Sequence, residues 1–264
     1  MYIKAKKSLG QHFLNSPAVL AKIIEAARLK EGETVLEIGP GGGVLTRALL
    51  SAGAEVVAVE KDDRAYNLLG VEFERDIRNK TLNLHLADIL GAEPASFGLG
   101  NGKYALVANI PYYITGAILE KFLEYEPRPN RMVLLVQKEV AERIVAQDGK
   151  ESILSISVKA FGTPKIISRV PRGAFTPAPN VDSAILSIEN VSNTHFAEKG
   201  LVIKRFFDIV RAGFAHKRKF VKRNLEGVAT ADVLNRIWHE LKLGDKLRAE
   251  DLTLDQWLGI TLYL

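Results

Sequence analysis

Strand-like and helix-like segments alternate through the N-terminal half of this chain, and this alternation restricts the fold more than any other feature. Strands are expected at Thr34–Ile38, Glu55–Val59, Thr81–Leu86, Lys103–Ala108 and Arg131–Val136, with helices between them at Val44–Ala52, Asp62–Glu74, Thr115–Tyr125 and Lys138–Gln147. Several strands are continuously apolar, which is typical of strands buried on both faces of a parallel sheet. The pattern predicts an α/β fold with a doubly wound sheet.

The segments on either side of this core predict the rest of the architecture. Ser16-Pro17 has the form of a helix N-cap followed by proline at the first helical position, so a helix should start there. Two further strands are expected at Lys165–Val170 and Ser183–Glu189. The polar stretch Asn190–Lys199 is typical of a domain boundary, and the chain after it has helical periodicity. We therefore expect one domain over residues 1–195 and a smaller helical domain over residues 196–264.

Composition limits the classes of protein that need to be considered. The 264 residues are 47% hydrophobic and 25% charged, and none is cysteine. This excludes disulfides and thiolate metal sites, and no metal centre is expected. No apolar run approaches the roughly 18 residues needed to cross a membrane, and the basic N-terminus lacks the apolar stretch of a secretory signal. The cytoplasm is the expected compartment.

Basic residues are concentrated in one short region. The net charge is +5, and residues 201–225 contain eight Lys or Arg residues and a single acid, Asp208. Such an excess is typical of a surface that binds phosphate groups, so a nucleic acid is the expected partner. The alternative is a solvated helix face without a partner.

A glycine-rich loop follows the first predicted strand of the sheet. Its sequence is Glu37-Ile38-Gly39-Pro40-Gly41-Gly42-Gly43, where glycine allows sharp turns and the close approach of a ligand. Glu60 ends the next strand, where a carboxylate can accept both hydroxyls of an adenosine ribose. Asp88 follows the third strand and could accept from an adenine amine. All three features lie at carboxyl ends of strands, the edge at which open α/β sheets bind ligands.

The spacing of the glycines favours one nucleoside cofactor over another. The loop reads G-x-G-x-G, with Val44 at the position of the third glycine of a dinucleotide fingerprint. A pyrophosphate favours a helix N-terminus with few acids nearby, whereas a sulfonium that carries an amino group tolerates an acid such as Glu37. The loop therefore favours S-adenosyl-L-methionine over NAD.

The stretch Asn109-Ile110-Pro111-Tyr112 follows the fourth strand and can hold a planar amine. The Asn109 side chain supplies one carbonyl acceptor, the Ile110 main chain supplies another, and Tyr112 offers a ring for stacking. Adenine, with its exocyclic amine and flat ring, fits this arrangement. The alternative is an ordinary proline turn at the end of a strand.

Together these motifs resemble the KsgA-type family of small-subunit ribosomal RNA adenine N6,N6-dimethyltransferases. The resemblance rests on Ser8–Leu14, Glu37–Gly43, Glu60, Asp88, Asn109–Tyr112 and Phe175–Ser183, in that order, and it extends from about Lys6 to Leu225. It implies a Rossmann-like class I methyltransferase domain with a cofactor-covering segment in residues 1–30, and a helical RNA-binding domain. It also implies that Phe175 lies on the face of the target base opposite Tyr112.

The resemblance assigns roles to specific residues. The candidate cofactor-binding residues are Gln11, His12, Leu14, Glu37, Gly39, Gly41, Glu60, Lys61, Asp88, Ile89 and Asn109. The candidate catalytic residues are Asn109, Ile110, Pro111, Tyr112 and Phe175, and the candidate RNA-binding residues are Lys217, Arg218, Lys219, Lys222 and Arg223. Many relatives carry Asn at the position of His12, so its contact with the cofactor could be made by main chain or by either ring nitrogen.

The implied activity is dimethylation of N6 of two adjacent adenosines in the 3′-terminal hairpin of small-subunit (16S) rRNA, by a monomer that docks on the immature small subunit. Three alternatives remain open. They are a large-subunit rRNA adenine N6-methyltransferase, an NAD-dependent oxidoreductase, and an RNA-binding assembly or transcription factor on a methyltransferase scaffold.

Overall fold

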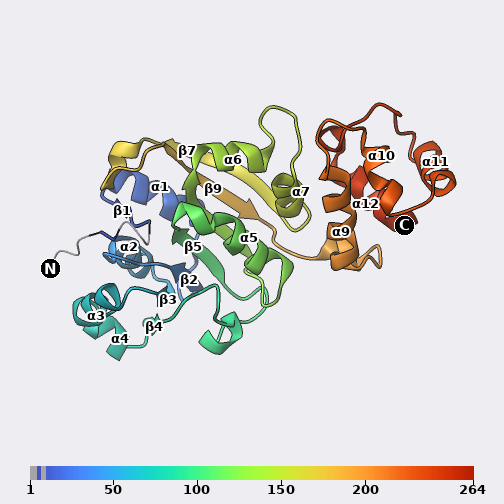
Figure 1. Ribbon diagram of the computed structural model, residues 1–264. Coiled ribbons are helices and arrows are strands. Elements are labelled where there is room, and N and C mark those ends of the chain that lie inside the picture. Colours follow the sequence, from blue (N-terminus) through green and yellow to red (C-terminus); the bar gives the residue numbers. More distant parts are fainter. Residues whose placement is uncertain (1–4, 7–9) are drawn as a thin grey trace. The chain divides into compact units, whose positions relative to one another are not determined.

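A computed structural model describes residues 5–6 and 10–264 of the chain, so Ser8 and Leu9 of the family motif lie outside the described residues (Figure 1). The chain forms two compact units. The first, here called the sheet unit, comprises Met1–Ala141 and Gly162–Val191, and the second, the helical unit, comprises Glu142–Phe161 and Ser192–Leu264. In the described residues no helix is long and apolar enough to span a membrane.

A seven-stranded sheet with the order β4-β3-β2-β5-β6-β9-β7 organises the sheet unit. Its strands are β2 (Thr34–Ile38), β3 (Glu55–Glu60), β4 (Leu82–Leu86), β5 (Ala105–Asn109), β6 (Arg131–Gln137), β7 (Thr163–Val170) and β9 (Ser183–Glu189). The first five are parallel to one another, while β9 runs antiparallel to both β6 and β7. All seven strands were predicted from the sequence, and β2 and β9 have the predicted bounds.

The helices of the sheet unit follow the predicted order. They are α1 (Pro17–Ala27), α2 (Val44–Ser51), α3 (Asp63–Glu72), α4 (Glu74–Arg78), α5 (Thr115–Glu124) and the first part of α6 (Lys138–Val145). Ser16 is the N-cap of α1 and its hydroxyl accepts the amide of Val19, as its sequence predicted. The single helix expected over residues 62–74 ends at Glu72, and α4 continues from Glu74.

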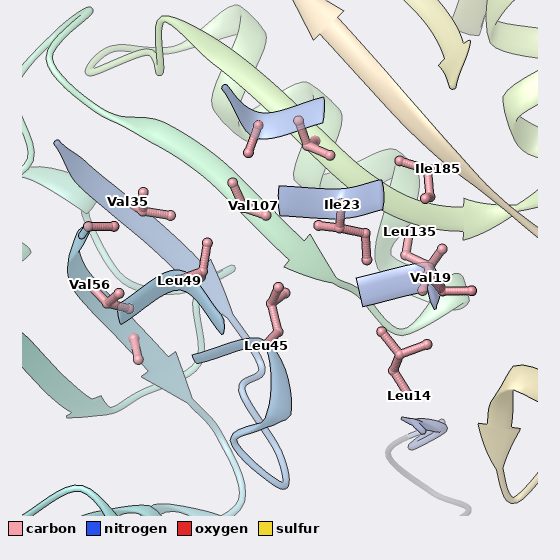
Figure 2. Packing of buried hydrophobic residues seen from close by; sticks show 14 of the residues in the cluster. Leu14, Val19, Ile23, Val35, Leu45, Leu49, Val56, Val107, Leu135 and Ile185 are labelled. Carbon is pink, nitrogen blue, oxygen red and sulfur yellow. The ribbon is translucent and has the colours of Figure 1, made fainter. Parts of the chain in front are cut away.

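One apolar core joins α1, α2 and α3 to the same face of the sheet. Val19 and Ile23 of α1 and Leu45 and Leu49 of α2 point toward Val107 and its neighbours on the strands (Figure 2). Five strands contribute to this cluster from one face of the sheet, since successive strand residues face opposite sides. Their residues in the cluster include Val35, Val56, Val107, Leu135 and Ile185. Burial of these side chains fixes the register in which the strand ends align.

A second, two-stranded sheet connects the N-terminal segment to a distant loop. Strand β1 (Phe13–Leu14) pairs antiparallel with β8 (Phe175–Thr176), with Leu14 opposite Phe175. The amide of Asn15 donates to the carbonyl of Ala174 at 2.9 Å, and the Asn15 side chain donates to the Thr176 hydroxyl at 2.6 Å. This pairing, which was not predicted, holds residues 10–14 beside the carboxyl edge of the main sheet.

The helical unit has an aromatic core of its own. Its helices are α7 (Ile153–Lys159), α8 (Thr194–Ala197), α9 (Ile203–Phe214), α10 (Val221–Asn224), α11 (Ala231–Glu240) and α12 (Leu254–Tyr263). The ring of Phe161, after α7, lies 5.3 Å from that of Phe196 and 6.1 Å from that of Phe207. These contacts place residues 142–161 with the C-terminal helices, whereas the sequence analysis assigned them to the domain of residues 1–195. The later boundary falls at Val191, within the predicted polar stretch.

Candidate active site

A pocket opens at the carboxyl ends of the parallel strands, and the predicted motifs converge on it. All eleven candidate cofactor-binding residues line this pocket, together with Ile110, Pro111 and Tyr112. They come from the segment that contains β1, from the loops after β2, β3 and β4, and from the end of β5. Since parallel strands that end at one edge bring their loops together, motifs far apart in sequence become neighbours.

Glu60 holds the glycine loop in place. One of its carboxylate oxygens accepts the amide of Gly41 at 3.0 Å, and the other accepts the amides of Lys61 and Asp62, both at 2.8 Å. Gly41 has φ +56°, and a Cβ there would lie 3.0 Å from the ring of Phe13, so glycine is required. Glu60 is only 5% exposed and burial raises its pKa, while the three amides favour its ionised form.

Glu37 is an acid without a hydrogen-bond partner for one of its oxygens. It is 1% exposed, and within the described residues its Oε2 atom has no partner. Burial raises the pKa of Glu37 to about 8, and the nearby charge of Glu60 adds to the effect. A cationic group in the pocket would favour its ionised form, so this acid suits a positively charged ligand.

Asp88 and Lys61 form an ion pair at the rim of the pocket. Their charged atoms are 2.7 Å apart, and the side chains are 44% and 58% exposed respectively. The other Asp88 oxygen accepts the amide of Leu90 at 3.1 Å, so both carboxylate oxygens already have one partner. Lys61 lowers the pKa of Asp88, whose carboxylate therefore stays ionised. The neighbouring Ile89 is buried and adds an apolar wall.

The amide of Asn109 has a defined orientation. Its Nδ2 atom donates to the main-chain carbonyl of His12 at 3.0 Å. This bond uses the donor end of the side chain and leaves Oδ1 as the acceptor that can serve a ligand. Asn109 therefore presents a carbonyl oxygen, which is the group that a clamp on an amine would need.

The hydroxyl group of Tyr112 holds its ring in place through a hydrogen bond. Its hydroxyl lies 2.6 Å from the hydroxyl of Ser183, at the start of β9. Burial raises the pKa of Tyr112, so the phenol is neutral at physiological pH. The ring of His12 stacks on that of Tyr112, with centroids 5.9 Å apart and planes inclined by 21°. In the sequence, Ser183 stands out only as the end of the Phe175–Ser183 motif, so its role as an anchor for Tyr112 was not predicted.

Asp62 is a second organising residue that sequence reasoning missed. Its buried carboxylate accepts from Gln11 Nε2 at 3.1 Å and from Lys6 Nζ at 3.4 Å, and it pairs with Arg64 at 2.6 Å. Arg64, the strongest influence, lowers the pKa of Asp62 well below its usual range. Asp62 also caps α3 by accepting the amide of Arg64. The N-terminal segment is thus tied to the pocket.

Phe175 does not lie where the sequence placed it. Its side chain is 3% exposed and belongs to the apolar core with Leu14, Val170 and Ile185, and it does not line the pocket. The reason is the pairing of β8 with β1, which places Phe175 opposite Leu14 and turns its ring inward. The expected wall opposite Tyr112 is absent from this arrangement of the described residues.

The candidate RNA-binding residues lie in the helical unit, between α9 and the end of α10. Lys217, Arg218, Lys219 and Arg223 are exposed, and in the described part of the chain no acid pairs with them. Lys222 differs, because it lies 2.9 Å from Asp245 and its ammonium group lies over the ring of Trp238 at 5.7 Å. Lys222 therefore has a structural role already.

The strand order and the position of the pocket define the class of protein. A mixed seven-stranded sheet with a glycine loop after its first parallel strand is the Rossmann-like fold of class I methyltransferases. A dimethyladenosine transferase from Plasmodium falciparum has a similar structure, with a TM-score of 0.78 and 26% identity over 94% of this chain and 96% of its own. The 23S rRNA methyltransferase ErmE is similar too, with a TM-score of 0.74 and 26% identity over 96% and 99%.

The chain belongs to the ribosomal RNA adenine dimethylase family, whose family model matches residues 2–264. Curated relatives extend over almost the whole chain. A ribosomal RNA small subunit methyltransferase A from Dehalococcoides mccartyi is 42% identical over 98% of this chain and 88% of its own length. The protein of that name from Fusobacterium nucleatum is 35% identical over 98% and 97%. The family and the fold predicted from the motifs are confirmed.

Proposed function

We propose that this protein is an S-adenosylmethionine-dependent methyltransferase that dimethylates N6 of adenosine in small-subunit rRNA. The observation that carries the proposal is the orientation of Asn109. Its Nδ2 atom is held by the His12 carbonyl, so that Oδ1 is available in the pocket beside the ring of Tyr112. An acceptor next to an aromatic face is the arrangement that an adenine amine needs.

The residues of the pocket suit S-adenosylmethionine, which when bound supplies an electrophilic methyl group. Glu37 has a buried oxygen without a partner, which can receive a cationic amino group. Gly39, at φ +65°, has no atom within 4 Å of the position of an added Cβ, so ligand atoms can approach its main chain there. We assign the ribose to Glu60 and the cofactor adenine to Asp88 and Ile89, as the family resemblance implies.

The proposed role of the protein in the reaction is to position the target amine. The N6 nitrogen is a poor nucleophile because its lone pair is delocalised into the ring. Asn109 Oδ1 and the Ile110 carbonyl would accept its two hydrogens and favour a tetrahedral nitrogen. Its lone pair would form the new N–C bond while the bond between the methyl group and sulfur breaks, which leaves S-adenosylhomocysteine. The proton leaves N6 for water afterwards, so no strong general base is required. Tyr112 would stack on the base.

The expected substrate is the 3′-terminal hairpin of 16S rRNA in the immature small subunit, with two adjacent adenosines each methylated twice. Curated relatives at 35–42% identity bear the name small subunit methyltransferase, whereas the 23S rRNA methyltransferase ErmE is 26% identical. Lys217, Arg218, Lys219 and Arg223, which pair with no acid among the described residues, supply a surface for phosphates. We propose that the enzyme acts as a monomer in the cytoplasm, where ribosomal subunits assemble.

The test is methyl incorporation into separate small-subunit, large-subunit and DNA substrates. We expect dimethyladenosine in small-subunit rRNA alone. Incorporation into large-subunit RNA alone would overturn the substrate assignment, and no incorporation into any of them would favour a non-catalytic RNA-binding factor. Asn109→Ala should abolish transfer while the cofactor Kd stays within about threefold, since its role is toward the amine. Retained transfer would refute the clamp.

A further inference from the structure

The side chain of His12 occupies a space that the proposed function needs for the substrate. Its ring lies against Tyr112 on one side, with centroids 5.9 Å apart. At the edge of the ring, the Nδ1 atom lies 2.7 Å from the carbonyl oxygen of Pro177. Because a carbonyl only accepts, Nδ1 carries the proton in this contact. The imidazole therefore contacts both Tyr112 and the loop 175–177.

The family resemblance places the target base against Tyr112, on the side of the loop 175–177, although the Phe175 ring itself lies in the core. The imidazole and the Tyr112 ring are inclined by only 21°, so the imidazole presents a flat ring to Tyr112 much as a stacked base would. The Tyr112 ring cannot readily turn away, because its hydroxyl is bound to Ser183 at 2.6 Å. A base that enters between Tyr112 and the loop must replace the imidazole.

We infer that His12 is a plug of the target-base pocket, which the entering adenine displaces from Tyr112. This inference rests on the proposed function, because it takes adenine as the entering base. The plug keeps the gap closed while no base is bound, and a base must stack on Tyr112 better than an imidazole does in order to enter. His12 thereby becomes a residue that affects which bases are accepted.

The contacts of His12 allow the ring to leave without disturbing the amine clamp. Asn109 is held by the main-chain carbonyl of His12 and not by its ring. Rotation of the side chain breaks the Tyr112 stack and the Pro177 hydrogen bond. The next two residues, Phe13 and Leu14, remain paired with β8. His12 is only partly buried, so the ring has a path to solvent.

The first measurement compares His12→Ala with the wild type on immature small subunits at saturating cofactor. Removal of one aromatic contact and one hydrogen bond should lower the KM for RNA by about three- to tenfold. His239→Ala, which removes an exposed imidazole of α11, is the matched control and should leave this KM unchanged. An unchanged KM in His12→Ala would overturn the plug, and a raised KM would show that the ring holds the base instead.

The second measurement follows the ring in the wild-type protein, so that the response to RNA does not depend on the folding of His12→Ala. In protein labelled at histidine, the His12 ring protons should show the ring-current shift of Tyr112, and this shift should disappear in Tyr112→Leu. A hairpin RNA with two adjacent adenosines should move these signals toward those of an exposed imidazole. The same hairpin with abasic target positions should leave them in place.

The two hairpins decide the inference. If both move the His12 signals equally, or if neither moves them while the wild type still methylates small-subunit RNA, the plug is refuted. Failure of the proposed function gives a different result, because the wild type would then transfer no methyl group to small-subunit RNA.

Discussion

Replacement of Glu60 by glutamine changes one atom of the carboxylate. It tests the two roles proposed for Glu60, which are to hold the glycine loop and to bind the cofactor ribose. Glutamine retains one carbonyl oxygen, which can still accept the amides of Lys61 and Asp62. Its NH₂ group then faces the amide of Gly41, where the carboxylate oxygen accepted at 3.0 Å. Two donors would oppose each other in a site where residue 60 is 5% exposed. The substitution should therefore release the glycine loop.

The size of the effect follows from these contacts. Loss of a charge-assisted hydrogen bond, with a buried amide left unsatisfied, costs about 1–3 kcal/mol. We expect Glu60→Gln to lower the free energy of unfolding by about that amount. The lost loop geometry and the lost ribose acceptor should each weaken cofactor binding by about 1–3 kcal/mol, so the Kd should rise by about 30-fold or more.

Urea unfolding and calorimetric titration with S-adenosylhomocysteine measure the two quantities. Glu31→Gln is the matched control, since Glu31 is an exposed glutamate of the same unit, and it should change neither. A Glu60→Gln protein that unfolds as the wild type does, and binds within about threefold of the wild-type Kd, would refute both the loop contact and the ribose assignment. Lower stability with unchanged affinity would leave the loop contact but exclude the ribose role.

Three further results are expected. Burial raises the pKa of Glu37 from 4.5 to about 8. Its stabilising effect relative to Glu37→Gln should therefore be complete below pH 4.5 and disappear as the pH rises to about 8. Urea unfolding at pH 5, 6.5 and 8 measures the difference in free energy of unfolding between the two proteins, and a difference that does not change with pH would contradict the prediction. Asp62→Asn should free the N-terminal segment and speed trypsin cleavage before residue 16, and unchanged cleavage would show that Asp62 does not hold it. Arg218→Ala should weaken RNA binding and reduce its salt slope by about 1 in filter-binding assays, whereas Lys204→Ala, whose charge is paired with Asp208, should do so less.

The prediction of the sheet succeeded where the local pattern was strong. β2 and β9 are buried over most of their length. Their largely apolar sequences are typical of strands that are covered on both faces of a sheet. Helix α7 was not predicted, because its seven residues give too short a pattern to identify. Its stability comes from contacts in the helical unit, such as those of Phe161 with Phe196 and Phe207.

In the candidate site, too, some residues could be located from the local sequence and others could not. The glycine loop, Glu60, Asp88 and Asn109 could be located from sequence, because each directly follows or ends a parallel strand and therefore reaches one edge of the sheet. Phe175 could not be placed, because the face to which its ring turns depends on its pairing with Leu14. Asp62 could not be recognised either, since its partner Gln11 is 51 residues away.

The sequence by itself determined the α/β class, the strands and the strand-end motifs, because buried strands and their turns have local residue patterns that do not depend on distant partners. Only the tertiary structure decided how the pocket is closed. Strands β1 and β8 have two residues each and exist only because they pair with one another. That pairing buries Phe175, brings His12 onto Tyr112, and lets the His12 carbonyl orient Asn109. Such contacts depend on segments more than 90 residues apart and have no signature in either segment alone.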